Sequence, residues 1–238
     1  MDRQLRLHQS LARKLGIAIS SGEILPGQRL DSDTENSAEL GVSRTAYREA
    51  LRLLTAKGMI ESRPKAGTHV TPRSRWNLLD PQVLDWMFSG PPNENFIVDL
   101  FELRSLIEPS AAGLAALRRT DEQMRAMEEA LDEMQTFGLA IEQGRLADQN
   151  FHRLIIEAAD NEALGSLISA IGSAVSWTTQ FKQRTRALPR DPLPDHRAVF
   201  EAIKARSSKR ASKLMNNLLQ LALVDMDIAP RSSRLSPD

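Results

Sequence analysis

A tight turn that leads into an amphipathic segment, at positions 41–51, constrains the fold of this chain more than any other feature. Gly41 permits a turn that other residues resist, and Ser43 is a favourable N-cap. The following apolar residues recur at three- and four-residue spacing and predict one buried helical stripe; they are Ala46, Tyr47, Ala50, Leu51 and Leu54. Arg44 and Arg48 fall on the opposite face, which suits either a solvated surface or the DNA major groove.

The sequence on both sides of this segment favours DNA. Ser32 and Glu35 form a capping box for a short helix that ends near position 40. An earlier helix is marked by the apolar spacing of Leu11, Leu15, Ala18 and Ile19. Downstream, positions 59–62 and 68–71 read as short strands around a basic tip at 63–67, and Gly58 is the expected end of the helix before them. Three helices followed by a basic β-hairpin predict a winged helix-turn-helix over residues 1–72.

Residues 23–71 resemble the DNA-binding domain of the GntR superfamily of bacterial regulators. The matching residues are Leu25-Pro26-Gly27, Leu30, Ser32, Gly41-Val42-Ser43-Arg44-Thr45, Arg48-Glu49-Ala50-Leu51, Leu54, Gly58, Gly67-Thr68 and Val70. Three positions depart from the family pattern: Thr34, where arginine is frequent, Asn36, where leucine is usual, and Ser37, where alanine is usual. Asn36 places a polar group where the second helix should face the core, which costs free energy unless the group is hydrogen-bonded.

The resemblance implies a set of DNA contacts. Arg44 and Arg48 are expected to reach base edges, where arginine pairs with guanine through bidentate bonds. Phosphate contacts are expected from Ser43 and Thr45, and minor-groove contacts of the wing from Lys65 and the backbone of Gly67; these six residues are the expected DNA-binding set. The double-stranded operator is thus the expected macromolecular partner.

The charge distribution agrees with this interpretation. Residues 1–75 hold 13 Lys and Arg against 8 Asp and Glu, whereas the remainder holds 18 against 23, so a net charge of zero combines a basic head with an acidic body. A basic head neutralises phosphates. The chain has no cysteine, no apolar signal core after Met1 and no apolar run long enough to span a bilayer, which predicts a cytoplasmic protein without membrane contact.

The rest of the chain reads as helical. A linker is expected over 73–95, with a short helix that starts at Asp80 and Pro81 and with Trp76 and Trp86 docking onto a domain surface. An all-α effector-binding and dimerisation domain is expected over 96–230, followed by a flexible tail at 231–238. Its helices are expected at 97–117, 121–141, 146–159, 162–181, 196–205 and 211–226. The predicted fold class is therefore mainly α.

One set of polar residues in the helical domain has side-chain types that can bind a metal ion. Asp148 and His152 are four residues apart and share a helix face, and His196 opens another helix. A carboxylate and two imidazoles suit a divalent Zn, Mn or Ni ion with positions left open for water or ligand. An Asp/His pair at this spacing is more often a surface hydrogen bond, so spacing alone does not decide.

The helical region is similar to the FCD domain of the FadR branch of the same superfamily. The matching residues are Leu103-Arg104, Glu108-Pro109, Ala111-Ala112, Asp148, Phe151-His152, Asn161, Leu164, His196, Ala202-Ile203, Ala211 and Met215. The resemblance implies a metal held by Asp148, His152 and His196, with Leu218 where a third histidine would stand. It is either a three-ligand site or one that has lost its metal.

The same resemblance gives Arg104 a role. It implies that Arg104 takes the carboxylate of an effector, whereas the residue pattern alone also allows an i,i+4 ion pair with Glu108. The effector-binding set is then Arg104, Asp148, His152 and His196, with further contacts expected from Trp177, Thr178, Asn150 and Gln149. The effector is expected to be a small carboxylate that also chelates the metal.

The Trp76-Asn77-Leu78-Leu79-Asp80 run, Trp86 and the missing third histidine resemble repressors of sugar-acid catabolism operons. The chain is thus expected to be a homodimeric repressor, not an enzyme, that an aldonate such as galactonate or gluconate releases from a pseudo-palindromic operator. Two alternatives stay open: a metal-dependent hydrolase or lyase that uses the Asp148, His152 and His196 set, and an architectural DNA binder that responds to no effector.

Overall fold

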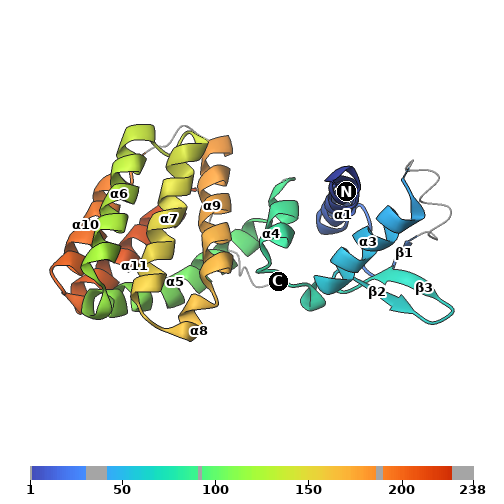
Figure 1. Ribbon diagram of the computed structural model, residues 1–238, viewed down its shortest axis with the longest axis horizontal. Helices are drawn as coiled ribbons and strands as arrows, with labels where there is room; N and C mark the ends of the chain where they lie inside the picture. The colour runs from blue at the N-terminus through green and yellow to red at the C-terminus, as the bar shows by residue number, and fades with distance from the viewer. Residues whose placement is uncertain (1, 31–41, 91–92, 186–189, 227–238) are drawn as a thin grey trace, which may run out of the picture. The chain divides into compact units, whose positions relative to one another are not determined.

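The computed structural model describes residues 2–30, 42–90, 93–185 and 190–226. The chain divides into two compact units, Met1–Pro92 and Asn93–Asp238, and each is described by itself. The first unit combines helices with a small sheet, and the second is built from helices in its described residues (Figure 1).

The first unit is a winged helix-turn-helix. Its elements are α1 (Asp2–Ser21), β1 (Arg29–Leu30), α3 (Arg44–Ala56), β2 (Ile60–Arg63) and β3 (Gly67–Val70). The strands form an antiparallel sheet in the order β1-β3-β2. The hairpin register sets Ile60 opposite Val70 and Arg63 opposite Gly67, so the basic tip lies at the far end of the wing. The predicted hairpin is confirmed; β1 was not expected, because two residues are too short to show an alternating pattern.

The expected second helix lies at residues 31–41, outside the described part of the chain. Thr34, Asn36 and Ser37, where the sequence departs from the family pattern, lie there as well.

Helix α3 forms where the local sequence predicts it. The Ser43 side chain accepts a hydrogen bond from the backbone N of Ala46 at 3.1 Å and caps the helix. Tyr47 and Leu54 are completely buried and anchor the helix to α1 and the sheet. Gly58, with a φ of +71°, follows the helix, and a Cβ on it would lie 2.2 Å from the carbonyl oxygen of Arg75. Any other residue there would be strained and would collide with backbone.

The residues after the wing belong to the first unit and pack on its other elements. They form η1 (Arg73–Arg75) and α4 (Pro81–Phe88), and α4 packs on α1. Trp86 lies flat against Gly16 of α1, where a Cβ would approach its ring to 2.2 Å. Trp76 donates its indole N–H to the carbonyl of Thr71 at 3.1 Å. Both tryptophans therefore hold this segment, expected as part of a linker, to the surface of the first unit.

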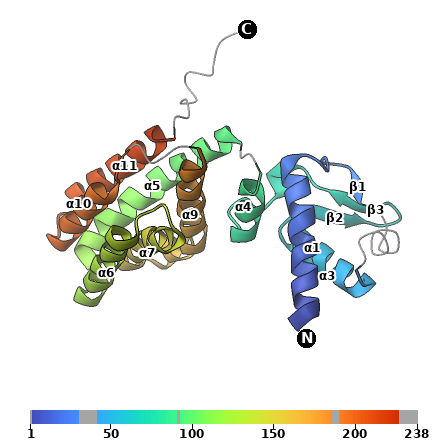
Figure 2. The same ribbon diagram turned by 90° about the horizontal axis from the view of Figure 1, so that it is seen from above.

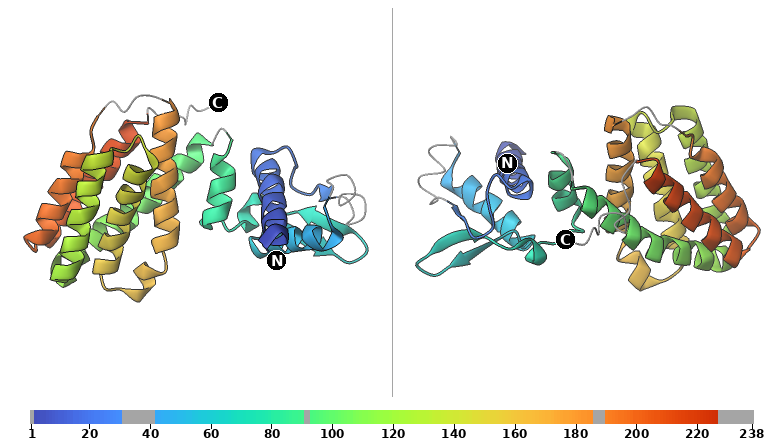
Figure 3. Two further views of the ribbon diagram at one scale, coloured as in Figure 1. Left: turned by 45° about the horizontal axis from the view of Figure 1, so that its top comes forward. Right: turned by 180° about the vertical axis from the view of Figure 1, so that it is seen from behind.

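The second unit is a helical bundle. Its helices are α5 (Glu94–Arg118), α6 (Asp121–Phe137), α7 (Glu142–Ala158), α8 (Glu162–Gly165), α9 (Ile168–Thr185), α10 (Leu193–Lys204) and α11 (Ser208–Val224). Helices α5 and α11 pack side by side (Figure 2), and α7 packs between α6 and α9 (Figure 3). The core cluster of this unit draws on all of these helices except α8.

Several boundaries in the bundle differ from expectation: α6 ends at Phe137 rather than at 141, and α7 begins at Glu142 rather than at 146. The helix expected over 162–181 is interrupted at 166–167, where Ser166 donates its hydroxyl to the carbonyl of Ala163 and closes the first turn. Helix α10 begins at Leu193 rather than at His196, and it includes Pro194 in its first turn. Proline needs no intrahelical partner there, because the first backbone N–H groups of a helix have none. His196 is consequently one turn into the helix.

No helix in the described ranges is both long enough and apolar enough to cross a membrane.

Candidate functional site

The residues expected to touch DNA lie on exposed surfaces of the first unit. Ser43, Arg44, Thr45 and Arg48 are exposed at and after the start of α3. The opposite face of α3 is buried, so the helix presents its arginines outward. Such a helix start, with polar and basic side chains exposed on one face, matches the way a recognition helix meets base edges and phosphates.

The wing tip has the backbone that a tight basic loop requires. Lys65 is exposed and has a φ of +62°, and Gly67 has a φ of +90°. A residue with a side chain rarely adopts a positive φ outside a tight turn. Lys65 is thus exposed at the tip of the hairpin, where its ammonium could approach a phosphate.

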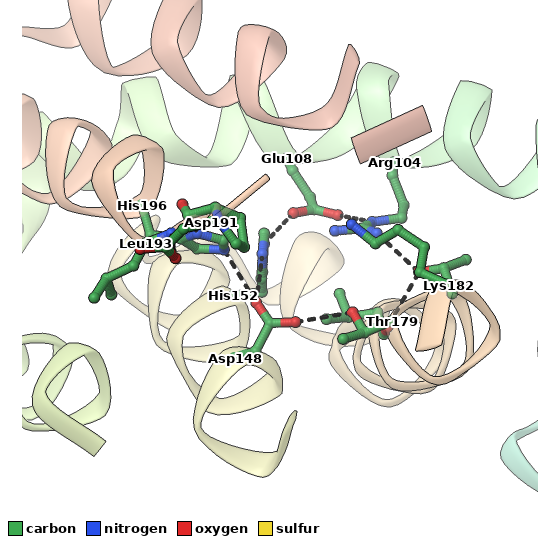
Figure 4. A network of polar contacts seen from close by, with 12 residues as sticks. Arg104, Glu108, Asp148, His152, Thr179, Lys182, Asp191, Leu193 and His196 are labelled. Carbon is green, nitrogen blue, oxygen red and sulfur yellow. Dashed lines mark hydrogen bonds and ion pairs between the residues drawn. The ribbon is translucent and has the colours of Figure 1, made fainter. Parts of the chain in front are cut away.

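A second candidate site is a polar cluster buried in the helical unit (Figure 4). Asp148 and His152 come from α7, His196 from α10 and Arg104 from α5, and each is at most 4% exposed. The ligand atoms of Asp148, His152 and His196 all lie within 4.8 Å of one another. The structure therefore brings together the four residues that the sequence singled out, although they span 93 positions from Arg104 to His196.

The hydrogen bonds of the two imidazoles leave both Nε2 atoms as possible metal ligands. His196 Nδ1 lies 2.8 Å from the carbonyl oxygen of Pro192, and His152 Nδ1 lies 2.5 Å from Glu108 Oε2. Both partners can only accept, so in a neutral imidazole the proton sits on Nδ1 and Nε2 carries a lone pair.

Both Nε2 atoms point at the same carboxylate oxygen. His196 Nε2 lies 3.0 Å from Asp148 Oδ1 and His152 Nε2 lies 3.6 Å from it. His196 Nε2 is buried without a hydrogen bond despite that short distance. Lone pairs that face each other this closely repel unless a proton or a metal ion lies between them. The donor set of two imidazoles and one carboxylate therefore fits a divalent first-row metal.

Without a metal, a proton on His152 Nε2 would face Asp148 Oδ1 across the 3.6 Å contact. Burial alone would lower the pKa of His152, but the carboxylates of Glu108 and Asp148 outweigh burial and raise it to about 9. Burial would likewise raise the pKa of Asp148, yet its contacts with His152 and His196 hold it well below its usual range. The site is therefore built to hold positive charge in either form.

Glu108 links His152, one of the three candidate metal ligands, to Arg104. Its Oε1 accepts from Arg104 Nε at 2.5 Å while its Oε2 contacts His152. Burial alone would raise the pKa of Glu108, but the charges of Arg104 and His152 lower it to about 2. Both alternatives for Arg104 are thus compatible with the structure, since the i,i+4 ion pair forms and the guanidinium still lines the cavity.

Glu108 also orients the imidazole of His152. The sequence placed Glu108 beside Arg104 but gave no sign of this role, because 44 residues separate it from His152. A carboxylate that holds the far nitrogen of a metal-binding histidine fixes both its tautomer and its orientation.

Helix α9 supplies polar residues that sequence reasoning missed or left unordered. Thr179 donates to Asp148 Oδ2 at 3.0 Å, and Arg104 Nη1 donates to Thr178 Oγ1 at 3.3 Å. Lys182 is 7% exposed and lines the same cavity; burial lowers its pKa, although Asp148 and Asp225 act in the opposite direction. The residues 178, 179 and 182 share one face of α9, and that spacing was the signal available.

Of the further pocket contacts expected, Thr178 lines the cavity. Gln149 instead packs against Gly172, where a Cβ would approach its amide nitrogen to 2.9 Å, and Asn150 accepts from Arg153. The described lining of the cavity does not include Trp177.

The cavity at the centre of this cluster is small. Its water-accessible volume is about 20 Å³, which is room for about one water molecule or ion. Leu218 lines it and has no ligand atom, so the described lining supplies three ligands rather than four.

Two family models match the chain. The model for bacterial regulatory proteins of the gntR family matches residues 7–70, and the model for the FCD domain matches residues 99–221. The chain belongs to the GntR family and carries an FCD domain. The FCD match spans Arg104, Asp148, His152 and His196, so all four residues of the buried cluster of this GntR-family regulator lie within that domain.

Curated relatives agree with this assignment. The chain is 33% identical over 202 residues to the galactonate operon transcriptional repressor of Escherichia coli, covering 84% of this chain and 87% of the relative. It is 36% identical over 222 residues to an uncharacterised HTH-type transcriptional regulator, YieP, of the same organism, covering 91% and 94%. A solved structure of Lar, which controls the agr system of Listeria monocytogenes, superposes with a TM-score of 0.65 at 17% identity, covering 98% and 97%, and shows a shared fold.

This GntR-family protein is therefore a DNA-binding transcriptional regulator with an effector-binding domain. Its domains and its relatives are those of regulators, not of enzymes, so the hydrolase and lyase interpretation of Asp148, His152 and His196 is set aside.

Proposed function

We propose that this regulator represses a sugar-acid catabolism operon as a homodimer, and that an aldonate releases it from its operator by binding in the helical domain together with a divalent metal. The observation that carries this proposal is the convergence of two imidazole Nε2 atoms on Asp148 Oδ1, in a cavity that Arg104 also lines. The similarity to a galactonate operon repressor supports the choice of acid.

Asp148, His152 and His196 would hold the metal, and Glu108 would orient His152. The bound metal would supply a Lewis-acidic position for a hydroxyl or carboxylate oxygen of the acid. Zn, Mn and Ni all suit this donor set. Arg104, fixed by Glu108 and Thr178, would pair with the acid's carboxylate through its remaining N–H groups.

The buried charges support an anionic ligand. Arg104 and Lys182 are balanced by Glu108 and Asp148 among the strongly buried residues. A divalent ion would add two positive charges to this balance, and Asp225, 3.9 Å from Lys182, is itself paired with Arg190 at 3.3 Å. Uncompensated buried charge is costly. A carboxylate from the effector would reduce the excess positive charge.

The size of the cavity supports a coupled movement. A sugar acid is many times larger than a cavity with a water-accessible volume of about 20 Å³. Its binding would therefore require the walls contributed by α5, α7, α9 and α10 to move. An effector shifts a conformational equilibrium only by its difference in affinity for the two states, and an enlarged cavity provides that difference.

Operator release tests this function directly. DNA sites selected from a random pool by the purified, zinc-loaded protein would be titrated with D-galactonate and D-gluconate, and with galactitol as a matched polyol that lacks the carboxylate. We expect the acids to reduce binding in a fluorescence anisotropy assay and galactitol to have no effect. Specific DNA binding that none of the acids alters would contradict the sensor and favour an architectural DNA binder.

The homodimer is tested separately. We expect the selected sites to contain two inverted half-sites and the free protein to sediment as a dimer, because a two-fold symmetric protein matches a pseudo-palindrome. A monomer that binds a single half-site would contradict this part of the proposal.

A further inference from the structure

Lys182 is a second buried cation in the effector cavity. It lies on α9, is 7% exposed, and lines the cavity together with Arg104 and the three candidate metal ligands. Figure 4 shows Arg104 and Lys182 on one side of Asp148 and His196 on the other. Lysine is rarely buried to this degree, because removing an ammonium from water is costly unless an anion compensates it.

The ion pairs in the cluster are unequally tight. Arg104 is held at 2.5 Å by Glu108, which leaves its charge largely compensated. The ammonium of Lys182 lies 3.9 Å from Asp225 Oδ2, within ion-pair distance. An incoming carboxylate would therefore meet two buried cations at the cavity wall, each with a carboxylate partner of its own.

The carboxylate of Asp225 would still have a cationic partner if Lys182 moved away. It is the C-cap residue of α11, and its Oδ2 also lies 3.3 Å from Arg190 Nη2. If Lys182 turned toward a ligand, Asp225 would keep Arg190 as a partner. The pair is thus arranged so that a second anion can compete for the lysine.

We propose that Lys182 and Arg104 together form the carboxylate subsite of the effector cavity, and that Lys182 leaves Asp225 to bind the acid. This inference deepens the proposed function and rests on it. Lys182 would thus give α9 a direct contact with the ligand. The ion pair between Lys182 of α9 and Asp225 at the end of α11 would break when the ligand binds.

Isothermal titration calorimetry with D-galactonate on the zinc-loaded full chain tests the inference. Lys182→Met keeps the length of the side chain and removes its charge; we expect it to weaken binding by about tenfold to a hundredfold, the range of a charge-assisted hydrogen bond. Lys182→Arg should retain most of the affinity. Lys204→Met, at an exposed lysine that stacks on Phe200 outside the cavity, should not change it.

Asp225→Asn separates a binding role from a structural one. It removes the anion that competes for Lys182, so we expect galactonate to bind more tightly. A lysine needed only to hold α9 against α11 would give weaker binding in both Lys182→Met and Asp225→Asn. Zinc binding, measured by competition with a chromophoric chelator, should be retained in all four variants and report that the site is folded.

The outcomes distinguish this inference from the function on which it rests. Wild-type protein that binds galactonate with the same affinity as Lys182→Met overturns the inference and leaves the function standing. Weakened binding in Asp225→Asn also overturns it. Wild-type protein that binds no sugar acid, although it binds zinc, overturns both.

Discussion

The recognition helix and the buried cluster place charged residues in opposite settings. On α3, Arg44 and Arg48 stand exposed at the start of one helix whose other face is buried. In the helical unit, Arg104 and Glu108 are 4% and 1% exposed and contact residues from other helices. The first arrangement leaves the arginines available to a partner, whereas the second makes each charge depend on its neighbours.

This difference separates function from stability. An exposed side chain can be removed at little cost to folding, so its loss is felt when the partner binds. A buried charge in a network cannot be removed without leaving another charge uncompensated. Substitutions on α3 should therefore alter DNA binding alone, and substitutions in the cluster should alter stability as well as ligand binding.

The largest expected effect is on stability, and the chain offers a matched pair of glutamates to measure it. Glu108→Ala should lower the free energy of unfolding by about 3–5 kcal/mol, because it breaks a buried pair and strands Arg104. Glu157→Ala breaks the exposed i,i+4 pair with Arg153 and should cost about 0.5 kcal/mol or less. Urea denaturation of metal-free protein measures both, and equal losses would remove the distinction between the two settings.

Metal binding is expected to give the next largest effect. Zinc at a free concentration of about 100 times its Kd should stabilise the protein by about 2.7 kcal/mol, because it binds only the folded state. His196→Ala, which removes a ligand, should abolish this gain, and His8→Ala on α1 should leave it intact. Thermal unfolding with zinc and with a chelator provides the measurement; an equal gain in His196→Ala would exclude this histidine as a ligand.

The smallest expected change in free energy is in DNA binding, where it is enough to weaken recognition of the operator. Arg48→Ala should weaken binding to the selected site by about 1–3 kcal/mol through loss of a base contact. It should leave the free energy of unfolding and the affinity for galactonate unchanged. Arg52→Ala, at another exposed arginine of α3, is the control and should have a smaller effect on specific binding. A variant of Arg48 that loses effector affinity too would show that the two settings are not separable.

Local sequence predicted the winged head and the α-helical body because both rest on short-range signals. The Ser43 cap and the apolar spacing of Tyr47 and Leu54 are contained within one helix, so the helix could be predicted from its own residues. The Asp80 cap with Pro81 predicted the start of α4 in the same way. Where such signals are weak, as at the two-residue β1 or at the first turn of α10 among prolines, the prediction failed.

The candidate site divides along the same line. Asp148 and His152 could be paired from sequence because one helical turn separates them, and the family resemblance supplied His196 and Arg104. The bond from Glu108 to His152, the bond from Thr179 to Asp148 and the burial of Lys182 join α5, α7 and α9. No local pattern encodes which faces of these helices meet.

The sequence alone determined the family, the recognition helix and the residue types able to bind a metal and an acid, because these are properties of single segments. Only the tertiary structure decided that both imidazoles direct Nε2 at one oxygen of Asp148, that Glu108 sits between Arg104 and His152, and that Lys182 enters the cavity. The physical reason is that charge compensation in a buried site depends on distances of a few ångström between helices, and packing, not spacing along the chain, sets those distances.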